Sequence, residues 1–298
     1  MSRVAPAGAL AVVAALTAVL SGPPPTAPAA FPGANGKIIF YSTRDGSPEV
    51  FVTEAGGKDQ HGFDPAAIGY FPSFSPGSKK IAYQSTGGPA RIVVMRADGT
   101  NRRPITPKDV FSANPAFGRG LIAFSREVKD NEDIYLIRPN GSHERRLTRH
   151  PRDEHAAAFS PNGKWVVFTG QTPGVDLFRV NVKTKRVRRL THTDSVEENE
   201  ANVSPDGKRI AFTRYDDGTY DIGIMRADGS HRRMLTDDSE FDAFPCFSPN
   251  GKRIAFSHIE SGESEEEIVV MDLDGRHRKP ITDIDGQDVA PDWGVERR

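Results

Sequence analysis

Short apolar runs separated by turn signals recur along the chain. The clearest copies are SPDGKRIAF, from Ser204 to Phe212, and SPNGKRIAF, from Ser248 to Phe256. When the aromatic residue that closes each run is taken as a marker, six copies appear, separated by 43, 41, 44, 44 and 44 residues. The markers are Phe40, Tyr83, Phe124, Phe168, Phe212 and Phe256. A fixed spacing of this length indicates a repeated structural unit.

Each copy of the repeat contains four short segments that alternate with turns. The tetrapeptide Ser-Pro-Asp/Asn-Gly, as at Ser204 to Gly207, is typical of a type I turn, because Pro sets φ at its second position. The runs between turn signals span four to six residues and are rich in β-branched and aromatic side chains, which favours strands over helices. Each unit is therefore predicted to be a four-stranded antiparallel meander, whose strands we label a to d.

The two ends of the repeated region complement each other. The first unit begins at GKIIF, Gly36 to Phe40, which is a strand b without a strand a, and APDWG, Ala290 to Gly294, supplies a matching strand a at the far end. A meander with two apolar faces needs neighbours on both sides, and a ring provides them. The sequence predicts an all-β fold, a six-bladed β-propeller of four-stranded antiparallel blades over residues 31–298, closed by the C-terminal strand joining blade 1.

Residues 1–30 are expected to be a signal peptide. Arg3 precedes a 14-residue apolar stretch, Ala7 to Leu20, which is too short for a membrane span and is followed by the A-x-A cleavage pattern Ala27-Pro28-Ala29. No cysteine follows the stretch where a lipid would be attached. We expect a secreted protein, periplasmic or extracellular, with no membrane span after signal removal. An uncleaved N-terminal anchor is the alternative.

Composition and motifs argue against several classes of function. The formal net charge is −1, which argues against nucleic-acid binding. Cys246 is the single cysteine, so no internal disulfide is possible, and its place in strand a predicts a small packing residue rather than a reactive thiol. GxSxG, HExxH, CxxC, P-loop and GxGxxG signatures are absent. RHPRDEH, Arg149 to His155, offers two His and two acids without a fixed ligand spacing, so we expect no metal and no cofactor.

Comparison of the repeats points to one face of the predicted propeller. The a–b and c–d turns are tight and repetitive, so the variable b–c loops and d-to-a crossings gather at the other face, around the channel mouth. Four crossings carry an acid five residues before the strand-a marker. The candidate partner-binding residues are Glu154, Glu198, Asp242 and Asp288, with His155, Glu200, Arg44, Arg126, Arg214 and His258 near them. Two hypotheses stay open: a polar cup that grips a cationic or mixed-charge partner, or acids and arginines that pair with each other across neighbouring blades.

Other charged positions recur in most units, which is typical of scaffold. An acid opens strand c in five units, and a basic pair lies in strand d, where charge on an exposed edge prevents aggregation. An anionic polymer bound around this rim is the alternative. HIESGESEEE, His258 to Glu267, is predicted to be a solvated acidic loop, with a cation site as its alternative.

Four segments carry a resemblance to a known family. FSPNGKRIAF (Phe247 to Phe256), VSPDGKRIAF (Val203 to Phe212), DIYLIRPNG (Asp133 to Gly141) and IVVMRADG (Ile92 to Gly99) resemble the WD40-like, PD40-type repeat of TolB-family propellers. The resemblance extends from about Gly36 to Gly294. It implies a periplasmic propeller whose mouth binds an envelope partner, the peptidoglycan-associated lipoprotein. The additional N-terminal α/β domain of that family is not expected in this chain.

We therefore predict a monomeric, non-enzymatic propeller that binds a protein or cell-envelope partner through its loop-rich face. The alternative is a carbohydrate- or small-molecule-active propeller enzyme, of lyase or glycosidase type, that uses acids at the channel mouth. A third hypothesis is a wall-associated protein held by its rim.

Overall fold

The computed structural model describes residues 30–193, 195–282 and 286–296. The expected signal peptide, apart from Ala30, lies outside the described residues. Within the described ranges every regular element is a strand, as an all-β prediction requires, and no helix long and apolar enough to span a membrane is found there.

The strands fall into four classes that match strands a to d of the predicted repeat. The inner strands, of class a, are β4 (Gly69–Phe74), β8 (Ser112–Phe117), β12 (Glu154–Phe159), β16 (Glu197–Val203), β20 (Phe241–Phe247) and β24 (Asp288–Val295). Class b comprises β1 (Asn35–Ser42), β5 (Lys80–Ser85), β9 (Ile122–Glu127), β13 (Trp165–Gln171), β17 (Arg209–Asp216) and β21 (Arg253–Ile259). Class c comprises β2 (Glu49–Thr53), β6 (Ile92–Arg96), β10 (Glu132–Ile137), β14 (Val175–Asn181), β18 (Thr219–Arg226) and β22 (Glu267–Asp272). The outer strands, of class d, are β3 (His61–Gly62), β7 (Arg103–Pro104), β11 (Arg145–Arg146), β15 (Val187–Arg189), β19 (Arg233–Met234) and β23 (Lys279–Pro280).

The strands pair antiparallel in groups of four, in the order a, b, c, d. Group 1 is β24-β1-β2-β3, group 2 is β4 to β7, and groups 3 to 6 follow in chain order. Groups 4, 5 and 6 are joined by single parallel pairs, Val175 with Glu197 and Tyr220 with Phe241. Group 1 combines both ends of the described chain, since Trp293 pairs with Ile38.

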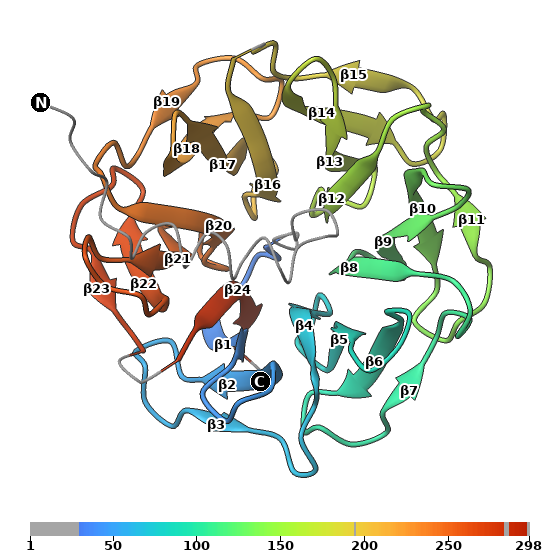
Figure 1. Cartoon of the computed structure of the whole chain (residues 1–298), viewed down its shortest axis with the longest axis horizontal. Coiled ribbons are helices and arrows are strands. Elements are labelled where there is room, and N and C mark those ends of the chain that lie inside the picture. Colours follow the sequence, from blue (N-terminus) through green and yellow to red (C-terminus); the bar gives the residue numbers. More distant parts are fainter. Residues whose placement is uncertain (1–29, 194, 283–285, 297–298) are drawn as a thin grey trace, which may run out of the picture.

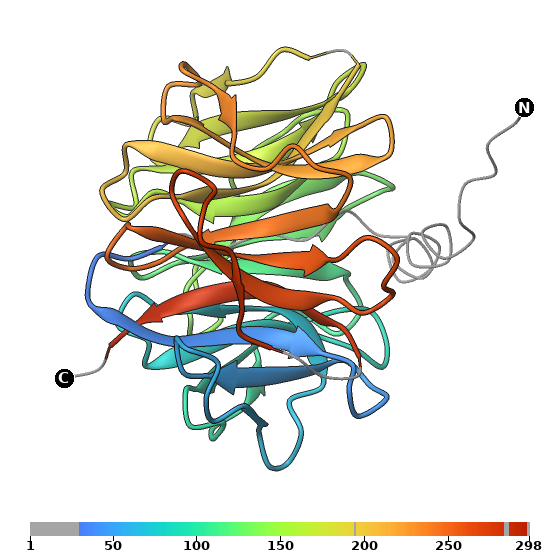
Figure 2. The same cartoon turned by 90° about the vertical axis from the view of Figure 1, so that its left-hand side faces the viewer.

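The groups are arranged around a central axis, with the inner strands nearest to it and the short outer strands at the rim (Figure 1). Seen from the side, the strands run broadly across the thickness of the molecule, so the connections lie on its two faces (Figure 2). Because pairing is antiparallel, the a–b and c–d turns share one face, which we call the turn face. The b–c loops and d-to-a crossings share the other, which we call the loop face.

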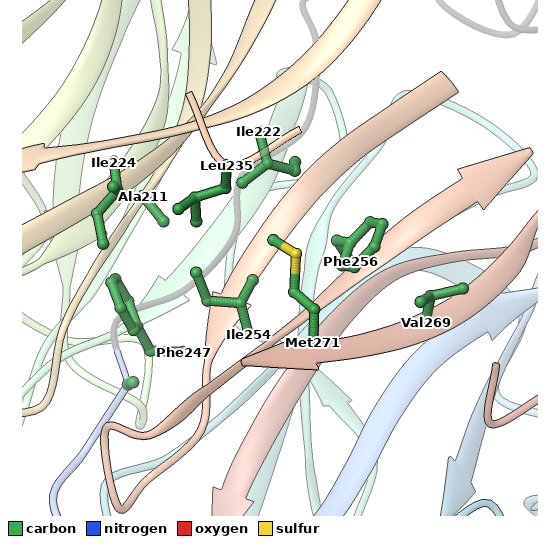
Figure 3. Close-up of a cluster of buried hydrophobic side chains, with 10 residues drawn as sticks. Ala211, Ile222, Ile224, Leu235, Phe247, Ile254, Phe256, Val269 and Met271 are labelled. Carbon is green, nitrogen blue, oxygen red and sulfur yellow. The ribbon is translucent and has the colours of Figure 1, made fainter. Parts of the chain in front are cut away.

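Apolar clusters lie between adjacent groups, which is why the apolar runs of strands b and c are buried. Figure 3 shows the cluster between groups 5 and 6, where Phe247, Ile254 and Met271 face Ala211 and Ile222. The aromatic markers are at most 5% exposed. Removing such a buried ring costs about 3–5 kcal/mol, so these clusters carry much of the stability.

Each inner strand has a bulge at the same place. Its register against strand b shifts there, and one residue other than glycine adopts φ between 51° and 56°. These bulge residues are Phe71, Asn114, Ala156, Glu200, Phe244 and Ala290. Left-handed conformations are uncommon away from glycine, so their recurrence marks the bulge as part of the repeat.

The small residue two positions after the bulge residue links neighbouring groups. In four of the six inner strands its side chain accepts a hydrogen bond from a backbone N–H of the next inner strand, whereas Ala116 and Ala158 in the other two have no acceptor atom. The four such bonds run from Phe74 N to Asp292 Oδ2 (2.5 Å), Phe117 N to Ser73 Oγ (3.0 Å), Phe247 N to Asn202 Oδ1 (3.0 Å) and Trp293 N to Cys246 Sγ (3.3 Å). Cys246 is buried and free, as expected of a packing residue, and burial raises its pKa.

The recurrent charges of strands c and d are largely tied to the scaffold. Asp133 forms an ion pair with Arg146, and Asp176 with Arg189, each between strands c and d of one group. The threonine that ends each basic segment accepts a hydrogen bond from strand c. These acceptors are Thr106, Thr148, Thr191, Thr236 and Thr282, at 2.8–3.0 Å. This pattern agrees with the predicted scaffold role.

Candidate functional site

The four acids predicted for the crossings all stand at the start of an inner strand, on the loop face. Each is opposite a residue near the end of strand b, in the pairs Glu154 with Gly170, Glu198 with Arg214, Asp242 with His258 and Asp288 with Ser42. Their exposed fractions are only 0–5%, so they lie beneath the surface rather than on it. Burial makes their partners decisive, because an unpaired buried charge is costly.

In group 6, Asp242 is held by two cations. His258 Nδ1 lies 2.7 Å from Asp242 Oδ1, and Arg278 Nη1 lies 3.6 Å from Oδ2. Burial alone lowers the pKa of His258, but the hydrogen bond to Asp242 and the charges of Asp242 and Glu240 outweigh it, so the pKa is raised. The imidazole is therefore biased towards its charged form beside the carboxylate.

In group 1, Asp288 is held by Arg44 from the b–c loop. Arg44 Nη2 donates to both carboxylate oxygens of Asp288, at 3.1 and 2.9 Å, and to Gln60 Oε1 at 3.3 Å. The guanidinium also lies over the Phe51 ring, 4.4 Å from its centroid. Burial raises the pKa of Asp288 although Arg44 opposes it.

Groups 5 and 3 use other pairings. Glu198 forms an ion pair with Arg232 and accepts a hydrogen bond from Thr193 Oγ1 at 2.9 Å. Arg214 pairs with Asp216, and Arg126 with Glu144. All of these pairs, like those of groups 1 and 6, lie within one group. Pairing across neighbouring blades, one of the two hypotheses for these residues, is therefore wrong for them.

Glu154 differs from the other three acids because group 4 supplies no cation for it. Gly170 stands opposite it, and Val187 occupies the place in the outer strand that Arg232 has in group 5. Within the part of the chain that is described, Glu154 Oε2 has no hydrogen-bond partner. Burial raises the pKa of Glu154 to about 7, with Thr148 and the more distant Arg146 opposing.

Further unsatisfied polar groups lie next to Glu154 along the inner strands. Both ring nitrogens of His155 lack a hydrogen bond to any other described residue, and so does the Oδ1 atom of Asn199. Burial lowers the pKa of His155 to about 3, so the ring is neutral. Glu200 is better placed, since Thr213 Oγ1 donates to its Oε2 at 2.6 Å and Phe244 N at 3.2 Å, yet burial raises its pKa to about 8.

The same inner-strand positions are apolar on the other side of the axis. In groups 6, 1 and 2 they form one cluster with Tyr41, in which Tyr41 and Phe71 meet edge to face at 5.3 Å. The cluster members are Tyr41, Phe71, Ala243, Phe244, Val289 and Ala290. The inner surface thus has a polar half, contributed by groups 3 to 5, and an apolar half.

Sequence reasoning missed Glu266. The acidic loop before it is exposed from 260 to 265, as predicted, but Glu266 is only 1% exposed. Burial raises its pKa to about 8, with Ser257 opposing, and neither carboxylate oxygen has a well-formed hydrogen bond among the described residues. The available signal was a glutamate directly before the recurrent acid of strand c, since Glu266 precedes Glu267 as Glu132 precedes Asp133 in group 3. Glu132 is buried as well, and burial raises its pKa to about 8.

The arrangement can accept hydrogen bonds and bind cationic groups, but it offers no metal cage. In residues 30–193, 195–282 and 286–296, no three His, Cys, Asp or Glu side chains come together as ligands of one ion. The polar half consists of carboxyls that titrate near neutral pH and of neutral imidazole and amide groups. Such a surface suits a partner rich in N–H donors.

Comparison with known proteins identifies relatives. The family described as "TolB beta propeller domain" matches residues 64–297. A TolB homologue of Chlorobium luteolum is 27% identical over 135 residues, 44% of this chain and 30% of the relative. The Tol-Pal system protein TolB of Desulfosudis oleivorans is 30% identical over 118 residues, 38% of this chain and 26% of the relative. The matches thus span less than a third of these relatives' own length.

A solved structure resembles the fold over most of the chain. The crystal structure of TolB from Acinetobacter baumannii matches with a TM-score of 0.74 and 23% identity, covering 88% of this chain and 67% of that one. At this identity the likeness concerns the fold alone.

Proposed function

Because the chain belongs to the TolB β-propeller family, we propose that it is an exported, non-enzymatic propeller that binds a protein of the cell envelope through its loop face. We further infer that the groups of strands are six blades and that β24 closes their ring. Two observations support closure: β24 pairs with β1, and it also contacts the inner strands β20 and β4. Export rests on the apolar stretch near the N-terminus.

The binding proposal rests on one observation: several buried polar atoms on and next to Glu154 have no hydrogen-bond partner among the described residues. Buried polar atoms in folded proteins nearly always have a hydrogen-bond partner, so exceptions call for an explanation. Here Glu154 Oε2 and both nitrogens of His155 in β12, and Asn199 Oδ1 in the neighbouring β16, have no such partner among the described residues. A ligand that brings donors to these atoms would relieve the cost of burying them.

The depth of these atoms defines how the partner would bind. Glu154, His155 and Asn199 are 4–7% exposed, so a flat surface could not reach them. We expect a narrow segment of the partner to enter along the axis, with lysine, arginine or backbone N–H groups directed at the polar half. Since the pKa of Glu154 is about 7, its attraction for a cation should strengthen as the pH rises towards 8.

The enzyme hypothesis finds less support. A general acid or base must be free to exchange a proton with a substrate. Glu198, Asp242 and Asp288 are instead engaged by Arg232, His258 and Arg44. Of the four, only Glu154 forms no ion pair with a described residue, and a single unpaired carboxyl suits recognition better than a paired-carboxylate mechanism.

The partner we propose is a Pal-type, peptidoglycan-associated protein, because one relative is a Tol-Pal system protein. The test is calorimetric titration of the processed chain with the Pal-type protein of the same organism. Glu154→Gln combined with His155→Leu should weaken binding by about tenfold or more, because two hydrogen-bond sites are lost. Lys129→Gln, which changes an exposed lysine in the b–c loop of group 3 on the same face, is the control and should stay within about twofold.

Equal losses in the two variants would show that the loop face binds without using the polar half. No binding by the wild-type chain would exclude the Pal-type partner.

A further inference from the structure

One position of the outer strands spans the groove to the next group. It is the residue of strand d that pairs with the strand-c residue directly after the partner of the aromatic marker, and we call it the strap position. These strand-c partners are Val52, Val94, Leu136, Arg179, Ile224 and Val270. The strap residues are His61, Arg103, Arg145, Arg188, Arg233 and Lys279. Four of the six are arginine, one is lysine, and group 1 alone has histidine.

In three groups the strap arginine crosses the groove and binds the next group. Its guanidinium donates to a backbone carbonyl in the neighbouring c–d turn, on the turn face. The bonds are Arg103 Nη2 to Pro139 O (2.9 Å), Arg145 Nη2 to Val182 O (3.5 Å) and Arg233 Nη2 to Leu273 O (2.8 Å). In these three groups the long, charged arginine side chain therefore occupies the groove between its own group and the next one.

The groove between groups 1 and 2 lacks this strap. His61 is too short to take its place, and its Nδ1 lies 3.0 Å from Asp59 O, in the turn of its own group. The carbonyl that would accept the strap belongs to Ala97, which stands two residues before the turn glycine Gly99 as Pro139 stands two residues before Gly141. A cavity of about 660 Å³ opens here, and both His61 and Ala97 line it. That volume is within the range of sites that bind small ligands.

A second groove supports the link between strap and cavity. Between groups 6 and 1 the strap residue is Lys279, and a smaller cavity of about 370 Å³ is lined by Lys279 and Ala55. Ala55 stands two residues before the turn glycine Gly57, as Ala97 stands two residues before Gly99. Both grooves beside group 1 thus contain a cavity, and in both the strap residue is not arginine. The larger cavity lies beside His61, the shorter side chain, and the smaller one beside Lys279.

The lining of the larger cavity is acidic over an apolar base. Four carboxylates, of Glu54, Asp64, Asp98 and Glu296, line the cavity together with one lysine, Lys37, which pairs with Glu54 at 3.3 Å. Phe63 contributes apolar surface and packs against Gly99 of the next group. A cation with an aliphatic stem would find both a counter-charge and a surface to lie on.

We propose that this cavity binds the guanidinium group of an arginine side chain presented by a partner peptide, in place of the absent strap. The guanidinium would donate to Ala97 O, as the strap arginines donate to the equivalent carbonyls, and would pair with Asp64 or Asp98. The site lies on the turn face, opposite the loop face, so it is independent of the envelope partner proposed above. It requires no covalent step.

The test uses N-acetyl-L-arginine amide as the probe and N-acetyl-L-citrulline amide as its neutral isostere. Binding is followed by NMR titration of the isotopically labelled processed chain. The arginine probe should shift resonances of groups 1 and 2 saturably, and the citrulline probe should bind roughly tenfold more weakly, because it lacks the charge. His61→Arg restores the strap and should weaken arginine binding roughly tenfold by occupying the cavity.

The matched control is Arg103→His, which opens the next groove and leaves this one intact. It should not weaken the shifts in groups 1 and 2. Glu154→Gln should leave them unchanged too, which separates this site from the loop face. If His61→Arg fails to give the wild-type circular dichroism spectrum, Asp64→Asn replaces it and should weaken binding several-fold. Equal binding of the two probes, or undiminished binding in the strap or carboxylate variant, would overturn the proposal.

Discussion

Groups 4 and 5 are neighbours built on the same repeat, yet their equivalent acids have different surroundings. Glu198 is fully buried and held by Arg232 and Thr193, whereas Glu154 is buried with a free Oε2. The difference arises from the loss of a cation, since valine stands at 187 where group 5 has Arg232. In a repeat protein, a missing partner can therefore mark a candidate site as clearly as an added charge does.

The largest effect is expected from making group 5 resemble group 4. Arg232→Met leaves the carboxylate of Glu198 buried without its cation, which should lower the free energy of unfolding by about 2–3 kcal/mol at pH 7.5, since Arg232 is partly exposed. Urea unfolding measures the loss. Arg226→Met, which changes an exposed arginine of the same group, is the control and should cost less than about 0.5 kcal/mol. An equal loss of unfolding free energy in the two variants would show that the Arg232–Glu198 pair contributes no special stability to group 5.

A smaller effect, visible only as a pH dependence, is expected from Glu154→Gln. Its folded pKa of about 7 is raised from the usual 4.5, so the proton-bound form stabilises the folded chain below pH 4.5 and this stabilisation is lost as the pH rises to about 7. Between pH 5 and pH 8 the wild type should lose about 1–2 kcal/mol more than the glutamine variant. Urea midpoints at the two pH values test this, and parallel slopes would contradict it.

The smallest effect is expected from supplying group 4 with the cation it lacks. Val187 is 51% exposed, so Val187→Arg disturbs no core and can place a guanidinium near Glu154, as Arg232 does for Glu198. It should stabilise the chain by less than about 1 kcal/mol at pH 8 and by nothing measurable at pH 5, where Glu154 is protonated. Val187→Lys and Val187→Gln separate charge from packing. Stabilisation that is equal at both pH values would show that Glu154 is not the partner.

The strands, turns and repeat could be predicted from the sequence because they depend on local patterns. Runs such as KRIAF and turns such as Ser204 to Gly207 specify backbone geometry within a few residues. The pairing of the region around Trp293 with that around Ile38 also followed from the repeat, since only a strand b lacked its strand a. The bulge residues did not follow, because nothing in their side chains requires a left-handed backbone.

The sequence by itself also determined where the loop-face acids stand, at the start of each inner strand. Which of them is satisfied was decided only by the tertiary structure. Glu198 meets Arg232 across 34 residues, through the register of four strands. The same register puts Val187 at that place in group 4, so Glu154 forms no ion pair with a described residue. The open groove beside His61 depends likewise on how two groups pack. Local preferences act over a few residues, whereas burial and pairing depend on distances that exist only once the groups are assembled.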